Sequence, residues 1–218
     1  MIATEYHKIE TLWNRDKETF SVIKGEFRIP EFGLVRPEAW IFQEKIDGTN
    51  IRVQWDGSDV EIGGKTNNAQ LPGDLLANLI REFTPSKLGA QFADASVVAP
   101  VVLCGEGYGP GIQKNGGAYR ADKGFILFDV RVGDWWLEWS NVQAVASGLG
   151  CSIVPTYENT IDGIVDGLMA DAIYSVCAAD PLRKAEGVVM RTEPTLYSSR
   201  GHRIMAKLKA SDFKAGKR

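Results

Sequence analysis

One lysine stands where a covalent reaction could take place. Lys45 lies in the stretch "FQEKIDGTNIRV", at the end of an apolar-alternating run and two residues before an Asp-Gly pair. A lysine amine can attack an electrophile and hold it covalently once the ammonium has lost its proton. Far downstream, Lys207 and Lys209 stand two residues apart in "MAKLK". Because ammonium groups bind phosphate oxygens, these two residues could hold a phosphate beside a reacting lysine.

Lys45 needs surroundings that favour its neutral form. Neighbouring cations have this effect, because they disfavour a further positive charge. At their i, i+2 spacing Lys207 and Lys209 share one face of a strand, and we expect that strand to fold back beside Lys45. Their charges would also offset the charge that builds on phosphate oxygens. The ordinary alternatives are an exposed hairpin lysine at position 45 and a solvated cationic strand face at 207 and 209.

Two glutamates accompany these lysines. Glu186 opens the apolar stretch "EGVVMR", and a carboxylate is the kind of hard oxygen ligand that Mg²⁺ accepts beside phosphate and water. Its ordinary alternative is a charge at a strand edge. Glu106 lies in "GEGYG", a glycine-rich turn in which backbone could approach a ligand closely.

Five stretches in this order resemble the motifs of the covalent nucleotidyltransferase superfamily, which contains the ATP-dependent DNA and RNA ligases and the mRNA capping enzymes. They are "EKIDGTN", "GEGYG", "FILFD", "EGVVMR" and "MAKLK", within residues 42–209. The stretch "EKIDGTN" is most similar to the RNA ligases, because it has Asn50 where DNA ligases and capping enzymes usually carry arginine. The lead-in "YHKIETLWNRD" also resembles RNA ligases.

This resemblance implies an ATP-dependent RNA ligase that works in three steps. Lysine attacks the α-phosphate of ATP, AMP passes from the lysine to a 5′-phosphate RNA end, and a 3′-hydroxyl displaces AMP to seal the break. The implied substrates are RNA ends or nicks in a duplex, in RNA repair. The alternatives are an ATP-dependent DNA ligase, a capping-type guanylyltransferase, and a nucleotide-binding or RNA-end-binding module that does not seal.

The resemblance also implies roles for single residues. Glu186 would hold Mg²⁺ or Mn²⁺, and Glu106 would accept a hydrogen bond from the ribose hydroxyls. Phe128 would stack on adenine, with Phe125 as the alternative ring and one of the two in the core. Lys65 replaces an arginine that is common in RNA ligases, and lysine lacks its bidentate fork. The predicted ATP contacts are Glu44, Lys45, Asn50, Lys65, Glu106, Phe128, Lys207 and Lys209, with Lys45, Lys207 and Lys209 as catalytic residues.

Glu44 and Arg191 are weaker candidates for site residues. Glu44 directly precedes Lys45, and Arg191 lies in the strand that follows Glu186. Both are also explicable as ordinary strand surface.

The elements that must position these residues indicate an α+β protein. We expect one domain over residues 1–218, a nucleotidyltransferase (ATP-grasp-like ligase adenylation) domain with antiparallel or mixed sheets flanked by helices. Alternation predicts two strands that meet at a positive-φ turn at Asp47-Gly48 and a hairpin with its bend at Gly133-Asp134. Helical spacing predicts helices over 73–84 and 161–179, and Ser140 is a candidate cap for a further helix through Gly148.

Charge is distributed unevenly along the chain. The net charge is only −3, yet seven Lys and Arg residues and a single Asp occupy positions 200–218. Residues 156–180 hold five acidic residues and no Lys or Arg. This polarity is typical of a phosphate-handling face on an otherwise acidic protein.

The remaining features bound the setting of the protein. Three separated cysteines favour a reducing, cytoplasmic location, and no apolar run approaches the ~20 residues of a membrane span. Nine residues follow Lys209, which leaves no room there for the OB-fold or helical module that relatives usually carry. We therefore expect a minimal core that holds RNA through its basic carboxyl-terminal segment or through an accessory protein.

Overall fold

The computed structural model describes residues 5–92 and 100–213, and the chain forms two compact units. The first unit comprises Met1–His7 and Asp47–Val154, and the second comprises Lys8–Ile46 and Pro155–Arg218. The expected single domain stays a prediction. Within the described residues, no helix combines the length and the apolar character that crossing a membrane requires.

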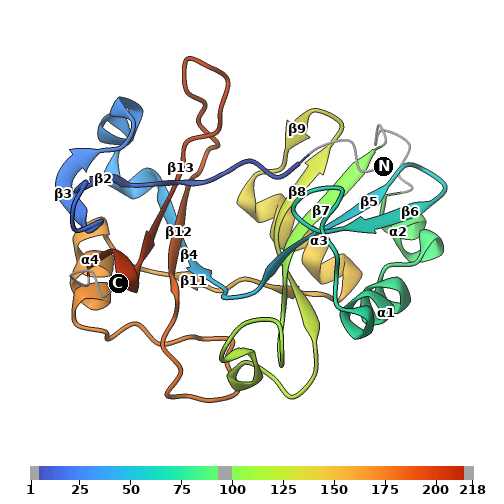
Figure 1. Ribbon diagram of the computed structural model, residues 1–218. Helices are drawn as coiled ribbons and strands as arrows, with labels where there is room; N and C mark the ends of the chain where they lie inside the picture. Colours follow the sequence, from blue (N-terminus) through green and yellow to red (C-terminus); the bar gives the residue numbers. More distant parts are fainter. Residues whose placement is uncertain (1–4, 93–99, 214–218) are drawn as a thin grey trace. The chain divides into compact units, whose positions relative to one another are not determined.

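The first unit is built on a six-stranded sheet with the order β10-β8-β7-β5-β6, in which β9 also pairs with β8 (Figure 1). The strands are β5 (Thr49–Trp55), β6 (Val60–Gly63), β7 (Val101–Tyr108), β8 (Gly124–Val132), β9 (Trp135–Trp136) and β10 (Ser152–Ile153). All pairs are antiparallel except β10 with β8. The predicted bend between β8 and β9 is confirmed, since Gly133 has a φ of 55° there.

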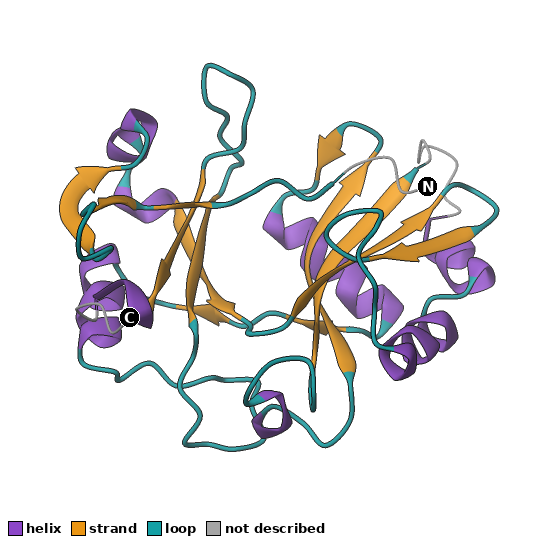
Figure 2. Cartoon of the chain, in the orientation of Figure 1, coloured by secondary structure: helices purple, strands orange, loops and turns teal. Residues whose placement is uncertain are grey.

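Three helices pack on one face of this sheet (Figure 2). They are α1 (Gly73–Glu82), α2 (Pro85–Phe92) and α3 (Trp139–Leu149). Phe83, next to α1, meets Phe125 of β8 edge to face, with 5.1 Å between the ring centroids. Phe92 of α2 stacks on Trp55 of β5, with 6.1 Å between the ring centroids. The helix-facing side chains are therefore the hydrophobic core of the unit.

The second unit is built on a five-stranded sheet with the order β1-β13-β12-β4-β11. The strands are β1 (Glu10–Thr11), β4 (Trp40–Lys45), β11 (Thr156–Tyr157), β12 (Gly187–Thr192) and β13 (Met205–Lys209). β1 lies parallel to β13, and the other pairs are antiparallel. A separate hairpin joins β2 (Trp13–Arg15) to β3 (Val22–Phe27). Neither large sheet closes into a barrel within the described part of the chain.

One face of the second sheet is covered by α4 (Ile161–Met169). Ile164, Val165 and Leu168 of this helix share a core cluster with Phe42 of β4 and Leu208 of β13. Alternate residues of β4 and β13 therefore point away from this core, and Lys45 and Lys207 are among them. The short 3-10 helices are η1 (Pro30–Leu34), η2 (Pro37–Ala39), η3 (Gly116–Ala118) and η4 (Ala210–Phe213).

The α+β prediction is confirmed, but several local predictions are wrong. β4 and β5 are both present, yet they belong to different sheets and do not form a hairpin. Gly48 is not among the described residues with positive φ. The helix predicted over 161–179 ends at Met169, and the chain then passes through Asp171, whose φ is 53°.

Two further differences concern the helices of the first unit. The cap of α3 is Glu138, so Ser140 lies inside the helix and is not its cap. No helix was predicted over Pro85–Phe92, where the structure has α2. Its apolar residues Leu88 and Phe92 are only four apart, too short a pattern to identify a helix.

Candidate functional site

The face of the second sheet that points away from α4 carries the predicted lysines. The strand register places Lys45 of β4 opposite Gly187 of β12, and Gly187 opposite Lys209 of β13. The two lysines thus stand in one row across three strands, with a glycine between them. A Cβ at Gly187 would lie 2.2 Å from the Leu208 carbonyl oxygen, so only glycine fits where β12 and β13 approach.

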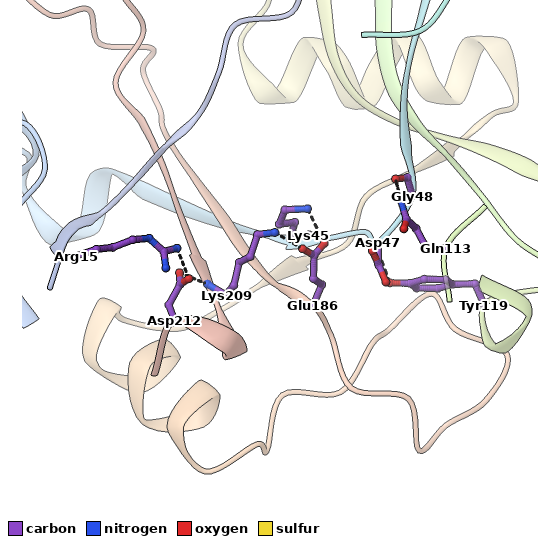
Figure 3. Close-up of polar contacts among 9 residues, drawn as sticks. All are labelled: Arg15, Lys45, Asp47, Gly48, Gln113, Tyr119, Glu186, Lys209 and Asp212. Carbon is purple, nitrogen blue, oxygen red and sulfur yellow. Dashed lines mark hydrogen bonds and ion pairs between the residues drawn. The ribbon is translucent and has the colours of Figure 1, made fainter. Parts of the chain in front are cut away.

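Glu186 bridges the two lysines of this row (Figure 3). The Lys45 Nζ lies 2.5 Å from Glu186 Oε2, and the Lys209 Nζ lies 2.5 Å from Glu186 Oε1. The three side chains are only 21–31% exposed, so water screens the contacts weakly. Burial would raise the pKa of the Glu186 carboxyl, but the charges and hydrogen bonds of Lys45 and Lys209 outweigh it and hold that pKa below its ordinary value.

Lys207 stands in the next row on the same face. It lies opposite Val189 of β12 and Thr11 of β1. Burial lowers the pKa of Lys207, and the charges of Lys209 and Lys45 lower it further. Among the described residues, no carboxylate forms an ion pair with its ammonium. The expectation that β13 carries two cations beside Lys45 is therefore met in the geometry, although the pairing with Glu186 was not foreseen.

Asp212 holds the end of β13 in place, and sequence reasoning did not identify it. Its side chain is buried, where it accepts a hydrogen bond from the Lys209 backbone N–H at 2.8 Å and pairs with the guanidinium of Arg15 (Figure 3). This fixes the backbone of Lys209. A single acid within the basic segment 200–218 was the available signal. The basic residues Lys214, Lys217 and Arg218 lie outside the described residues.

Glu44 points to the opposite face of β4 from Lys45, as neighbouring residues of a strand must. Its buried carboxylate accepts hydrogen bonds from the Ser175 hydroxyl and, at 2.8 Å, from the Val176 backbone N–H. The Cys177 thiol also lies 3.5 Å away. Glu44 therefore anchors the segment 175–177, and a contact from its side chain to a nucleotide stays a prediction.

Arg191 is not ordinary strand surface, and neither is Glu44. Both side chains are 2% exposed. Arg191 lies on the same face of β12 as Gly187, four residues farther along the strand.

In the first unit, Asn50 and Glu106 lie directly opposite each other on β5 and β7. They project from the face opposite the three helices, because Ile51 and Gly107, their neighbours along the strands, face Leu75 of α1. The Asn50 Oδ1 is buried and has no hydrogen-bond partner among the described residues. An unsatisfied buried acceptor is costly unless a ligand or water pairs with it.

Gly48 is required by close packing within this unit. A Cβ there would lie 2.3 Å from the Gly107 carbonyl oxygen and 2.7 Å from the Glu106 Cγ. Next to it, the Asp47 backbone N–H donates to the Tyr119 hydroxyl at 3.1 Å, and the Gln113 side chain donates to the Gly48 carbonyl oxygen at 2.9 Å (Figure 3). The conformation that follows Lys45 in the chain is thus held from two sides.

Phe125 and Phe128 have different surroundings. Phe125 is buried against Phe83 in the core. Phe128 is half-buried, and its ring meets Tyr6 at 5.1 Å. Tyr6 in turn donates to the buried Asp129 carboxylate at 2.9 Å. Phe125 is thus the core ring, and Phe128 stays the predicted stacking ring. Tyr6 was missed as a single residue, although it lies in the lead-in stretch that resembles RNA ligases.

Lys65 lies exposed in the loop that follows β6. The fully buried Arg52 of β5 holds this loop through a 2.7 Å hydrogen bond to the Gly64 carbonyl oxygen and a 3.1 Å bond to the Asn67 Oδ1. The contact of Lys65 with a phosphate stays a prediction.

Each unit therefore brings some of the predicted site residues together. Lys45, Glu186, Lys207 and Lys209 lie on one face of the second sheet. This arrangement can hold phosphate oxygens and a covalent adduct. A divalent cation at Glu186 would depend on phosphate and water for its other ligands, because the described residues contain no group of three or more His, Cys, Asp or Glu that could hold a metal. Mg²⁺ is commonly held in this way, so the single carboxylate fits it.

Residues 38–209 match the protein family described as RNA ligase. Among solved structures, the chain is similar to a Naegleria gruberi RNA ligase with PPi, with a TM-score of 0.58 and 18% identity, over 80% of this chain and 50% of that chain. It is also similar to an archaeal ATP-dependent RNA ligase, with a TM-score of 0.61 and 17% identity, over 97% of this chain and 49% of that chain.

A Naegleria gruberi RNA ligase variant with ATP and Mn gives a TM-score of 0.58 at 17% identity, over 80% of this chain and 49% of that chain. The chain thus spans about half the length of these solved relatives. At such low identity the likeness establishes a shared fold, and it confirms the nucleotidyltransferase type of fold that the motifs indicated.

Proposed function

Because the chain belongs to the RNA ligase family, we propose that it is an ATP-dependent RNA ligase that joins 5′-phosphate and 3′-hydroxyl ends through AMP attached to Lys45. The observation that carries this proposal is the row of Lys45 and Lys209 bridged by Glu186. The solved relatives named with ATP and Mn, or as ATP-dependent, support the choice of nucleotide.

In the proposed first step, the Lys45 Nζ attacks the α-phosphorus of ATP. A nitrogen–phosphorus bond forms, the bond from the α-phosphorus to the bridging oxygen breaks, pyrophosphate leaves, and the lysine proton passes to solvent. Lys207 and Lys209 hold the α-phosphate oxygens, where charge builds in the transition state. Glu186 orients the amine through its 2.5 Å contact with the Lys45 Nζ.

Glu186 is also the proposed ligand for Mg²⁺ or Mn²⁺. Lys45 must lose its proton before its amine can attack. A divalent cation at Glu186 would share a carboxylate oxygen that lies 2.5 Å from the Lys45 Nζ, and would therefore compete with the lysine for it. When bound, the cation supplies positive charge to the phosphate oxygens.

The roles proposed in the first unit follow from the resemblance and from the surroundings of each residue. Glu106 accepts a hydrogen bond from the ribose hydroxyls, and Phe128 stacks on adenine. Asn50, whose buried Oδ1 has no partner among the described residues, offers an acceptor to the nucleotide. Lys65 contacts a phosphate.

The setting and the substrates are proposals of the same kind. We propose RNA ends, including those at nicks in a duplex, as substrates in RNA repair, and an accessory protein as a source of further RNA contacts. The three cysteines are free, which supports a reducing, cytoplasmic setting.

The test is covalent labelling of the protein. Protein is incubated with α-labelled ATP or GTP and Mg²⁺ or Mn²⁺, denatured and separated on a gel. We expect label from ATP, and none in Lys45→Ala. Label from GTP alone would indicate a capping-type enzyme, and no label would indicate a binding module. Nicked duplexes with RNA or DNA on the 3′-hydroxyl side then test the sugar preference, because the 2′-hydroxyl is the group that distinguishes them.

A further inference from the structure

A cavity of about 290 Å³ opens beside Lys207 within the second unit. Side chains from three strands and the segments next to them converge on it. They are Lys8, Ile9, Glu10, Thr11, Arg15, Arg28 and Lys207. Four of the seven are cations and one is a carboxylate, so the cavity carries a positive charge surplus. We refer to it as the Lys207 cavity.

The cations of the Lys207 cavity are held in place to different degrees. The Glu10 carboxylate pairs with two of them: its Oε1 lies 3.2 Å from the Lys8 Nζ, and its Oε2 lies 3.7 Å from the Arg28 Nε. Arg15 is fixed by the buried Asp212. The Lys207 ammonium is half-buried and pairs with no carboxylate among the described residues. Glu10 attracts the Lys207 ammonium without forming an ion pair with it, and the charges of Lys209 and Lys45 act against that attraction. An anion in the cavity would add a direct counter-charge for Lys207.

The position of the cavity relates it to the lysine row. Lys207 lines the cavity and also stands on the same strand face as Lys209. β13 lies two strands from β4 in the sheet order, which is roughly 10 Å at the usual strand spacing. β1 lies on the far side of β13 from β4, so a ligand whose α-phosphate contacts Lys207 would reach Lys8, next to β1, only with a further phosphate group.

We propose that the Lys207 cavity binds a second phosphate group, in addition to the α-phosphate that reacts at Lys45. This inference rests on the proposed function and extends it to Lys8 and Arg28, which the proposed function leaves without a role. The phosphate has two sources: the pyrophosphate portion of the nucleotide, or the phosphate of an RNA strand. Arginine and lysine side chains suit both, because charge-assisted hydrogen bonds to phosphate oxygens are among the strongest in proteins.

The test is direct binding to the metal-free protein, with inorganic pyrophosphate in one arm and a 5′-phosphorylated oligoribonucleotide in the other. The variant is Lys8→Gln with Arg28→Gln, since these side chains are 71% and 51% exposed and not part of the core. The matched control is Lys17→Gln with Arg36→Gln, two exposed cations of the same unit that do not line the cavity. Both variants lose the same charge.

We expect the cavity variant to bind one of these ligands at least about tenfold more weakly than the control variant does. Weaker pyrophosphate binding assigns the site to the nucleotide. Loss of the preference for a 5′-phosphate over a 5′-hydroxyl oligoribonucleotide assigns it to the RNA strand. Equal affinities of the two variants in both arms, or no binding of either ligand by the unchanged protein, would overturn the proposal. These outcomes do not depend on AMP transfer, so absence of label at Lys45 would count only against the proposed function.

Discussion

Replacement of Gly187 by alanine changes the packing between the two lysines of the row without removing a charged group. The added Cβ would lie 2.2 Å from the Leu208 carbonyl oxygen and 2.8 Å from the Lys209 Cα. Both are backbone atoms of β13, so no side-chain rotation relieves the clash. β12 and β13 must therefore move apart at the residue that carries the Lys209 ammonium.

Two effects set the loss of stability in Gly187→Ala. Overpacking of a close-packed site costs about 1–3 kcal/mol, and each weakened ladder hydrogen bond adds about 1 kcal/mol. We expect Gly187→Ala to lower the free energy of unfolding by about 2–4 kcal/mol. A displacement of Lys209 by about 1 Å would slow formation of the AMP adduct on the order of 100-fold.

Urea unfolding followed by tryptophan fluorescence measures the first effect. Single-turnover labelling with ATP, at a temperature at which the variant is folded, measures the second. Gly73→Ala is the control, because no heavy atom lies within 4 Å of a Cβ there. We expect the free energy of unfolding of Gly73→Ala to equal that of the unchanged protein or to exceed it by up to about 1 kcal/mol. Unchanged stability and labelling in Gly187→Ala would refute the reasoning.

Three further substitutions test individual contacts. Glu186→Gln should be less stable than the unchanged protein above pH 4.5, the ordinary pKa of the carboxyl. Because the folded-state pKa lies lower, this difference should shrink as pH falls below 4.5 in thermal unfolding scans. Asp212→Asn should lower the free energy of unfolding by about 2 kcal/mol in urea, since the buried carboxylate pairs with Arg15 and accepts from the Lys209 N–H. Glu44→Gln should speed hydrogen exchange at the Val176 amide, which donates to Glu44.

Each of these expectations has a contrary result. A Glu186→Gln difference that does not change from pH 7 to pH 3 would mean that the ion pairs with Lys45 and Lys209 add no pH-dependent stability. An Asp212→Asn variant as stable as the unchanged protein would remove the case that Asp212 fixes the end of β13. Unchanged exchange at Val176 in Glu44→Gln would show that other contacts hold the segment 175–177.

Local periodicity accounts for the parts of the site that the sequence predicts well. The shared strand face of Lys207 and Lys209 follows from their spacing alone. The same rule places Glu44 on the opposite face of the strand from Lys45. The pairing between strands cannot be predicted in this way. Gly187 pairs with Lys45, for example, although the two residues lie more than 140 positions apart in the sequence. No local pattern contains that information.

The wrong local predictions have physical causes as well. Gly48 followed by alternation looks like a hairpin turn, but the glycine is needed because the Gly107 carbonyl oxygen lies so close. The apolar spacing that predicts a helix through 179 continues past Met169, while the left-handed backbone of Asp171 ends helical geometry. A tertiary contact outweighs the local pattern in the first case, and the local backbone conformation ends the helix in the second.

The attachment point of AMP is the decisive observable for this protein. After incubation with ATP and Mg²⁺ or Mn²⁺, proteolysis and mass spectrometry can locate the modified side chain. We expect AMP on the peptide that contains Lys45, and no adduct in Lys45→Arg. AMP on another residue, Lys207 or Lys209 included, or an adduct that persists in Lys45→Arg, would contradict the assignment of Lys45 as the nucleophile.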